Sequence, residues 1–338
     1  MKRVVVFVLI SFTWCSYADE SAQSWAQVYK KQVDADPYAK EFIFKQEKTI
    51  PFTQLIFSWN VERPPEGHFE FFIRVRDKAT KKWQDWHKMV QWGAHTQRSF
   101  FSRVKGSRFD YARFEMDAHK RGDAFQIKVI PYGASLEHVK LLAVVASDFY
   151  AFRAEPYGQR GKDLPSFRIH GVPKKSQLLV DHPRANALCS PTSMSMVVES
   201  LTQEYVDPLK FAERAYDPGL NVFGNWPFNM AHAFEHCQGK IYFYIDRLNS
   251  FEDLYRLLRE TNIPVAVSVR GTLTGGKKPY NNGHLMVVVG WDAENKKVIC
   301  FDPAFDNLDQ VEVAYDIHDF VKTWECSRRL VYKPEVAV

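Results

Sequence analysis

The sequence predicts an α+β protein in two parts: an all-β sandwich, then a domain whose helices come first and whose antiparallel strands follow. Three observations lead to this prediction. Short aromatic and β-branched runs separated by turn residues recur between residues 37 and 150. A stretch with little periodic apolar pattern, residues 151–164, reads as a linker. Beyond it, helix-start signals precede a series of strand-like runs, an order typical of α+β folds and not of βαβ units.

Length and composition limit the possible classes of protein. The chain has 338 residues, which is enough for about two domains, and its hydrophobic content of 46% is ordinary for globular protein. The net charge of +5 is mild and no long Lys/Arg stripe occurs, so we expect no nucleic-acid partner. No apolar stretch reaches the length of a bilayer-crossing helix, so we expect no membrane span.

The N-terminus has the pattern of a secretory signal peptide over residues 1–18. Lys2 and Arg3 precede an apolar run at residues 4–14, and residues 16–18 (Ser-Tyr-Ala) form a small-x-small cleavage site. We therefore expect cleavage after this site and a secreted or periplasmic protein. The polar residues 19–36 are predicted to form a short helix or arm.

The first domain is predicted to span residues 37–150 as an accessory β-sandwich. Its strand-like runs are residues 55–61, 69–76, 83–87, 111–116, 125–130 and 139–145. Four tryptophans, Trp59, Trp83, Trp86 and Trp92, are predicted to lie in its core. The alternative is that they form a surface for a carbohydrate or protein ligand.

The second domain is predicted to span residues 165–338. Helix-start signals stand at Cys189 or Ser190 with Pro191 in the first turn, at Pro227, at Ser250 with Asp253 as a capping box, and at Asp316. Strands are predicted at residues 240–245, 264–269, 284–291, 297–301 and 329–332.

Cys189 lies at the predicted beginning of a helix. The unpaired N–H groups and the dipole of a helix N-terminus favour a thiolate, which is the nucleophilic form of cysteine. The same N–H groups suit the oxyanion of a tetrahedral intermediate. Taken alone, however, the residue fits a structural cysteine of a core helix somewhat better than a nucleophile.

His284 and Asp302 change that balance. His284 begins an apolar strand after a turn, at the rim where an imidazole reaches a cleft. If Asp292 pairs with Lys296 across the next hairpin, Asp302 lies opposite Met286 and on the same face as His284. A register slip of one residue would put the two on opposite faces. Their plainer interpretations are a solvent-facing histidine at a strand end and an Asp-Pro turn.

Four segments together resemble the C39-like branch of papain-like cysteine peptidases. They are residues 172–177, 189–194, 283–291 and 301–304, and the resemblance covers about residues 165–335. It implies a thiol protease in which Cys189 is the nucleophile, His284 the general base and then acid, and Asp302 the group that orients the imidazole. It further implies that Gln177 donates to the oxyanion. The implied partner is a peptide or protein substrate, and no cofactor is implied.

One residue departs from the family pattern and leaves alternatives open. The family usually has glycine after the cysteine, whereas this chain has Ser190, which we expect to narrow the cleft or to alter activity. A hydrolase that cleaves a peptide or isopeptide bond is the favoured function. A catalytically weak binding protein on the same scaffold and a transpeptidase or amidase with the same triad are the alternatives.

Three further features carry smaller predictions. His232 and His236 are spaced i, i+4 on a predicted helix, but their context favours ordinary helix residues over metal ligands. If Cys189 is the nucleophile, at most one disulfide forms among the other cysteines that remain after cleavage, Cys237, Cys300 and Cys326. The glycine-containing loop at residues 271–276 is predicted to be either a lid or a plain surface loop.

Overall fold

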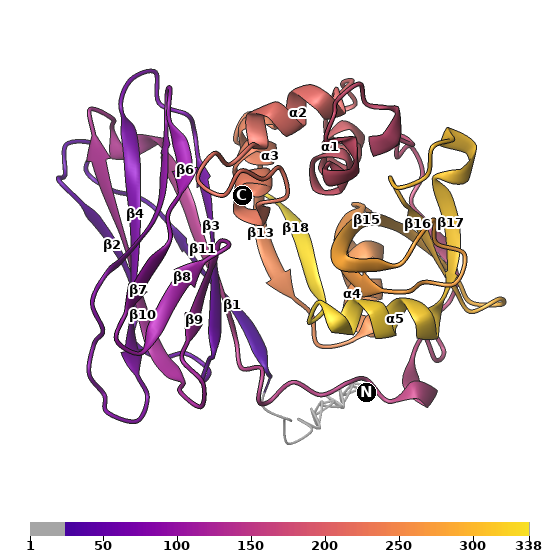
Figure 1. Ribbon diagram of the computed structural model, residues 1–338, viewed down its shortest axis with the longest axis horizontal. Coiled ribbons are helices and arrows are strands. Elements are labelled where there is room, and N and C mark those ends of the chain that lie inside the picture. The colour runs from indigo at the N-terminus through magenta and orange to yellow at the C-terminus, as the bar shows by residue number, and fades with distance from the viewer. Residues whose placement is uncertain (1–23, 338) are drawn as a thin grey trace, which may run out of the picture.

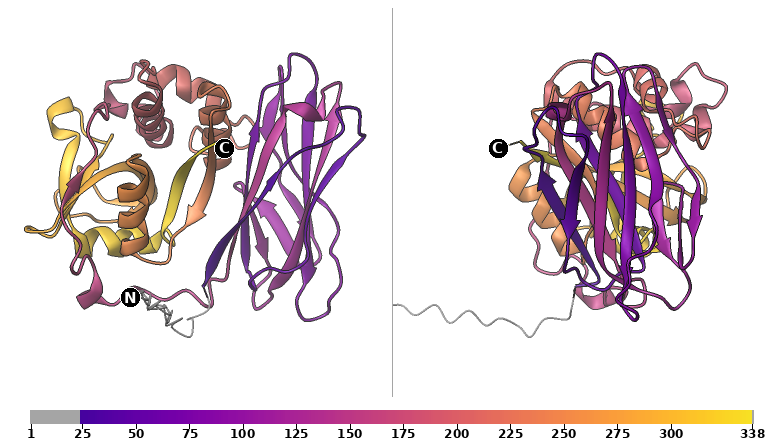
Figure 2. Two further views of the ribbon diagram at one scale, coloured as in Figure 1. Left: turned by 180° about the vertical axis from the view of Figure 1, so that it is seen from behind. Right: turned by 90° about the vertical axis from the view of Figure 1, so that its left-hand side faces the viewer.

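The computed structural model describes residues 24–337, and the α+β prediction is confirmed in it. The predicted signal peptide lies outside these residues. Figures 1 and 2 show two parts side by side, the first made of strands and the second of helices and strands. No helix within residues 24–337 is long and apolar enough to cross a membrane.

The N-terminal part contains two antiparallel sheets. The first has the order β1-β11-β3-β9-β8-β7 and the second β2-β10-β4-β5-β6. The strands are β1 (Ala26–Gln32), β2 (Phe42–Gln46), β3 (Gln54–Val61), β4 (His68–Asp77), β5 (His87–Gly93), β6 (Gln97–Ser99), β7 (Ser102–Val104), β8 (Ser107–Asp110), β9 (Arg113–Met116), β10 (Gly122–Tyr132) and β11 (Val139–Ser147).

Aromatic side chains from both sheets form one core. Phe57 and Trp59 of β3 contact Phe71 of β4 on the facing sheet, with ring centroids 5.4 and 5.6 Å apart. Trp92 of β5 is also fully buried and lies edge-on to Trp59. Rings of this size bury much apolar area each, so these aromatic contacts contribute strongly to holding the two sheets together.

Several sequence expectations for this part are corrected. The expected polar arm contains strand β1, which pairs with β11 along its whole length. The run at residues 83–87 mostly precedes the strand, which begins at His87. Trp83 and Trp86, expected in the core, are only partly buried and lie against the guanidinium group of Arg74 at the surface, because their segment is the irregular approach to β5.

The C-terminal part is built on one sheet with the order β13-β18-β14-β15-β16-β17, to which β12 (Phe167–Arg168) is added beside β15. Its strands are β13 (Ile241–Arg247), β14 (Val265–Gly271), β15 (Tyr280–Asp292), β16 (Lys297–Phe301), β17 (Glu312–Asp316) and β18 (Leu330–Val336). Its helices are α1 (Cys189–Thr202), α2 (Pro208–Ala215), α3 (Trp226–His236), α4 (Phe251–Thr261) and α5 (Ile317–Cys326).

Helices cover both faces of this sheet (Figure 1). Apolar residues of α1, α2 and α3 share one core with alternate residues of β15, such as Val287, whereas α4 and α5 share another core with the intervening residues, such as Met286. The predicted caps are partly as expected: Ser250 accepts from the N–H of Asp253, and Asp316 caps α5. Helix α2, capped by Asp207 with Pro208 after it, was not predicted.

The two parts are joined through side chains that cover an open strand edge. Strand β13 ends the C-terminal sheet, so its outer backbone groups have no neighbouring strand. Asn60 of β3 donates from Nδ2 to the carbonyl of Phe243 at 3.0 Å and accepts from its N–H at 2.7 Å. Ser58 Oγ accepts from the N–H of Ile245. Polar strand residues thus complete an edge that would otherwise invite pairing with another chain.

We expect Asn60→Ala to lower the free energy of unfolding by about 2–4 kcal/mol, because both backbone groups of Phe243 then stay buried without partners. Urea unfolding followed by circular dichroism measures the change. Asn281→Ala is the matched control, since Asn281 is exposed and its side chain makes no hydrogen bond among the described residues. A loss for Asn60→Ala within about 0.5 kcal/mol of the control would contradict the expectation.

Candidate active site

Cys189 is the first residue of helix α1. The N-cap is Leu188, and not Cys189 or Ser190 as expected from the sequence. The backbone N–H of Cys189 therefore lacks a partner within the helix, as expected for the first turn. The side chain is partly buried at the wall of a cleft of about 310 Å³. Helix α1 is anchored against β15 by Ser193, whose hydroxyl donates to the carbonyl of Leu285 at 3.0 Å.

His284 lies on β15 and reaches the same cleft. Gly283 before it has φ +89°, a conformation that glycine adopts without strain. The imidazole lines the same cleft as the thiol of Cys189 and lowers the pKa of that thiol. Its Nε2–H donates to Asp302 Oδ1 at 2.7 Å, which leaves Nδ1 for the sulfur. The ring is only 4% exposed, so its position is fixed by these contacts.

Asp302 reaches this position because a β-bulge shifts the pairing between β15 and β16 by one residue. The hairpin pairs Asp292 with Lys297, one residue away from the expected pairing with Lys296. A β-bulge at Val289 then absorbs one residue, so that Val288 pairs with Cys300 in the register expected from the sequence. Without the bulge, Asp302 would lie on the face opposite to His284.

Two tyrosines that sequence reasoning missed complete the surroundings of Asp302. Tyr280 and Tyr315 each donate to Oδ2 at 2.6 Å, and the N–H of Ala304 donates to Oδ1 at 2.9 Å. The Tyr280 ring also stacks on His284 with centroids 4.1 Å apart. The alternation in residues 312–315 was the available signal for Tyr315. Asp302 thus accepts four hydrogen bonds while fully buried.

The pKa shifts follow from these contacts. Burial alone would raise the pKa of Cys189, but His284 and the N–H groups of Leu285 and Ser190 more than offset it, so the thiol pKa is lowered. Burial opposes the charge on His284, yet Asp302 and the thiol raise its pKa well above the usual value. The pKa of Asp302 is lowered despite burial, because His284 and the two tyrosines favour the carboxylate. A thiolate–imidazolium pair held by a carboxylate is the favoured state.

Gln177 lines the cleft together with Cys189 and His284. It begins a short 3-10 turn, η3 (Gln177–Leu179), and its N–H donates to the carbonyl of Pro303, which ties it to the Asp302 loop. Its side-chain Nε2 donates to the carbonyl of Ala185 at 3.0 Å, and Oε1 is buried without a partner among the described residues. The structure therefore brings all four predicted site residues to one place.

The expectation that Ser190 narrows the cleft is wrong. Its side chain is fully buried and shares a hydrogen bond of 2.8 Å with the hydroxyl of Tyr332 on β18. At the second position of α1, the side chain points to the sheet and not to the cleft. The residue therefore stabilises the packing of α1 and leaves the space before the thiol unchanged.

The loop between β14 and β15 contributes to the cleft with residues 278–283 and not with the glycine-containing segment at 271–276. Lys278 donates to Asn186 across the cleft mouth at 3.3 Å. Lys277 forms an exposed ion pair with Asp306 beside it. The segment 271–276 is therefore set back from the thiol.

The other three cysteines and the pair His232 and His236 lie outside the cleft that contains Cys189. Cys237, Cys300 and Cys326 are all free thiols. His232 contacts Glu235 and the ring of Phe211. Among the residues that the structure describes, no group of three or more His, Cys, Asp or Glu side chains is arranged to hold a metal ion.

Comparison with known proteins agrees with this geometry. No curated protein matches the chain. Residues 169–332 match the sequence model of the Peptidase_C39 like family, and this range contains all four predicted site residues and most of the C-terminal sheet. This match over residues 169–332 supports a C39-like peptidase domain in the C-terminal part of the chain.

Proposed function

We propose that the protein is an exported cysteine peptidase that cleaves a peptide or isopeptide bond through a thioester intermediate. The observation that carries the proposal is that the thiol of Cys189 and the ring of His284 line one cleft, with the ring hydrogen-bonded to the buried Asp302. We further propose a papain-like arrangement of the C-terminal part, preceded by a β-sandwich accessory domain. Removal of residues 1–18 as a signal peptide belongs to the same proposal.

The proposed reaction has two steps. The thiolate of Cys189 attacks the substrate carbonyl carbon, and the resulting oxyanion accepts hydrogen bonds from the N–H of Cys189 and from the Gln177 amide. The imidazolium of His284 gives its proton to the leaving amine as the C–N bond breaks, which yields the thioester. Water then attacks the thioester while His284 takes its proton, and the carboxylic acid leaves as the thiolate is restored.

The two alternatives are a transpeptidase or amidase and a binding protein without catalysis. A transpeptidase or amidase uses the same groups, and an amine in place of water resolves the thioester. A binding protein without catalysis had its best support in Ser190, whose hydroxyl bonds Tyr332 inside the fold. We therefore favour catalysis and hydrolysis.

The proposal is tested by combining thiol labelling with a cleavage screen. Iodoacetamide at mildly acidic pH is expected to alkylate Cys189 first, because its pKa is lowered, and to abolish cleavage of a peptide library in parallel. Mass spectrometry of the products separates hydrolysis from amine-linked transfer. Labelling of the exposed Cys326 with Cys189 unreactive would overturn the proposal.

We expect kcat/KM to follow a broad bell against pH. The acid limb reports formation of the Cys189 thiolate, so activity rises with pH through a pKa below that of an ordinary thiol. The alkaline limb reports loss of the His284 proton, so activity falls with pH through a pKa well above that of an ordinary histidine. Because Cys189 and His284 titrate together, the apparent pKa of each limb is a property of the coupled pair. A fluorogenic peptide from the screen measures the profile, and activity that appears only above about pH 8.5 would contradict it.

A further inference from the structure

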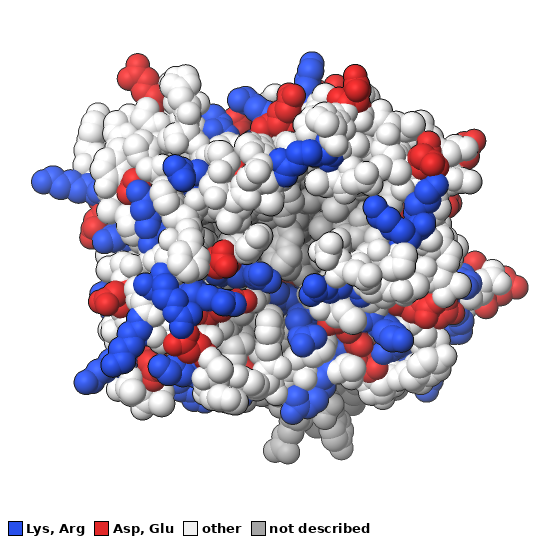
Figure 3. Space-filling view, in the orientation of Figure 1, with Lys and Arg blue, Asp and Glu red and all other residues white. Residues whose placement is uncertain are grey.

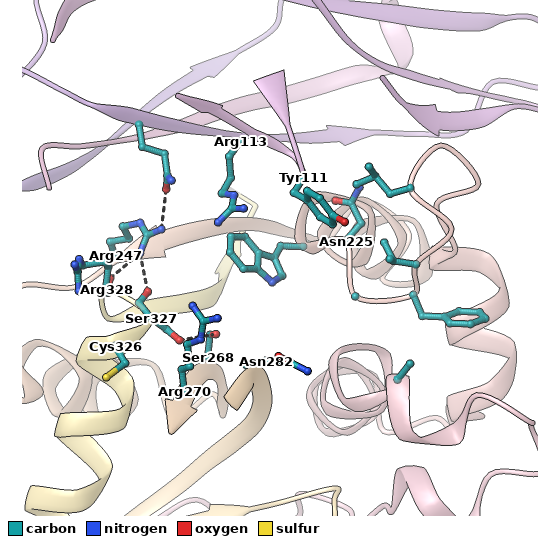
Figure 4. A pocket seen from close by; sticks show the side chains of 18 of the residues that line it. Tyr111, Arg113, Asn225, Arg247, Ser268, Arg270, Asn282, Cys326, Ser327 and Arg328 are labelled. Atoms are coloured by element: carbon teal, nitrogen blue, oxygen red, sulfur yellow. Dashed lines mark hydrogen bonds between the residues drawn. The ribbon is translucent and has the colours of Figure 1, made fainter. Parts of the chain in front are cut away.

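A second cavity lies between the two parts and not at the thiol. It has a volume of about 720 Å³. The N-terminal part contributes Gln54, Tyr111, Arg113 and Phe149, and the C-terminal part contributes the other walls (Figure 4). A cavity of this size accommodates several residues of an extended peptide.

This interdomain pocket adjoins the cleft that contains Cys189. Asn282 and Gly283 line both cavities. The segment before α1 also serves both, since Arg184 and Ala187 line the interdomain pocket whereas Asn186 lines the cleft. The two cavities therefore share part of their walls, and the pocket lies next to the cleft.

The lining of the pocket is cationic. It contains no aspartate or glutamate, and its five arginines are Arg113, Arg184, Arg247, Arg270 and Arg328. The ion pairs found within residues 24–337 involve other arginines, so none of these five has a carboxylate within 4.0 Å. Figure 3 shows basic side chains along the lower margin of the hollow between the two parts.

Arg247 is held in this pocket by neutral partners. It is 4% exposed and donates to the carbonyls of Ser327 and Arg328 and to Gln54 Oε1, at 2.8 to 2.9 Å. Its Nε is buried without a partner among the described residues. Burial and the charges of Arg113 and Arg328 lower the pKa of Arg247 to about 9, so it remains charged at neutral pH.

Arg113 and Arg328 resemble Arg247 in having a buried guanidinium nitrogen without a hydrogen-bond partner among the described residues. In both residues this atom is Nε. Their guanidinium groups lie over aromatic rings, Arg113 over Trp226 and Arg328 over Phe149. Cationic groups gathered without a counter-charge are costly to bury, and a carboxylate that enters among them gains strong two-pronged hydrogen bonds.

Two acidic side chains that act on residues of this pocket, one on Arg247 and one on Gln54, are already engaged. Asp246 pairs with Lys333, and Glu115 pairs with Arg108 and accepts from Gln54. Within residues 24–337 no carboxylate pairs with the five arginines, so a bound ligand is left to supply the counter-charge. Since the pocket adjoins the thiol, the substrate itself is the ligand placed to supply it.

We propose that the interdomain pocket binds carboxylate groups of the substrate, so that the enzyme selects peptides with acidic residues near the cleaved bond. This inference rests on the proposed peptidase activity for its second half, whereas the binding of acidic peptides stands by itself. The N-terminal part, through Arg113 and Tyr111, then takes a direct part in substrate selection.

Binding to the Cys189→Ala protein tests the pocket without turnover. Fluorescence anisotropy of fluorescein-(Gly-Glu)3 and of fluorescein-(Gly-Gln)3 compares peptides that differ only in charge. We expect the acidic peptide to bind at least tenfold more tightly, and Arg113→Gln or Arg270→Gln to weaken it about tenfold each. Arg98→Gln is the matched control, because Arg98 is exposed on β6, outside the pocket.

Three results would overturn the inference: equal binding of the two peptides, Arg113 and Arg270 variants that bind like the Arg98 variant, or binding of inorganic phosphate at the pocket with no binding of the acidic peptide. Failure of the peptidase proposal gives a different pattern. In that case the acidic peptide still binds and still depends on Arg113 and Arg270, but the wild-type protein does not cleave any bound peptide.

Discussion

Cys189→Ala is expected to reduce kcat/KM for peptide cleavage by at least about 10⁴-fold, because no other cysteine, serine or threonine lines the cleft to replace the lost thiol. What remains is the effect of substrate binding and of the oxyanion donors. The change removes a partly buried side chain from the surface of the cleft, so the fold is retained and the loss is chemical. Initial rates on a peptide from the library screen measure it.

Cys237→Ala provides the matched control for this loss. Cys237 is buried at the end of α3, and burial raises its pKa to about 12, so it is a packing residue and not a nucleophile. Its removal is expected to lower stability slightly and to leave kcat/KM unchanged. Retention of more than about a tenth of the activity in Cys189→Ala would exclude Cys189 as the nucleophile.

Asp302→Asn is expected to lower kcat by about 10³ to 10⁴-fold while keeping the shape of the side chain. The carboxylate holds the imidazolium of His284, and an amide loses the charge and offers an N–H where Tyr280 and Tyr315 already donate. Because the imidazolium is then less stable, the thiolate loses its partner, and the acid limb of the pH profile should move to higher pH. Initial rates measured against pH give both effects.

Two further variants separate the role of the charge from the role of packing. Tyr315→Phe removes one donor to Asp302 but keeps the His284 contact, so we expect a loss within about tenfold. Asp306→Asn changes an exposed carboxylate four residues further along and should leave kcat unchanged. An Asp302→Asn protein that loses activity with the limb of its pH profile unmoved would indicate a purely structural role.

The central part of the site was predictable because each residue carries a local signal. Cys189 precedes a proline in a helix-start pattern, His284 begins an apolar strand after a turn, and Asp302 ends the next strand. The face of Asp302 was predicted correctly although the hairpin pairing was one residue off, since the bulge at Val289 restores the expected register. A bulge of this kind leaves no mark in an apolar run of valines.

The parts that escaped prediction depend on contacts between segments distant in the sequence. Tyr280 was assigned no role because its segment read as an approach to a turn, whereas it extends β15. Strand β1 looked polar because it is exposed along one side and is held by pairing with β11 rather than by its own pattern. The pocket arginines come from both parts, and no spacing along the chain reveals that they meet.

The contact between Asn60 and Phe243 has a consequence for how this chain can be divided or recombined. Residues 151–164 look like a convenient place to cut, but a fragment that begins there exposes the bare rim of β13 and the apolar surface around Phe228, which packs on Trp59. Such a fragment is prone to self-association. We therefore expect that the two parts have to be expressed together and engineered as one unit.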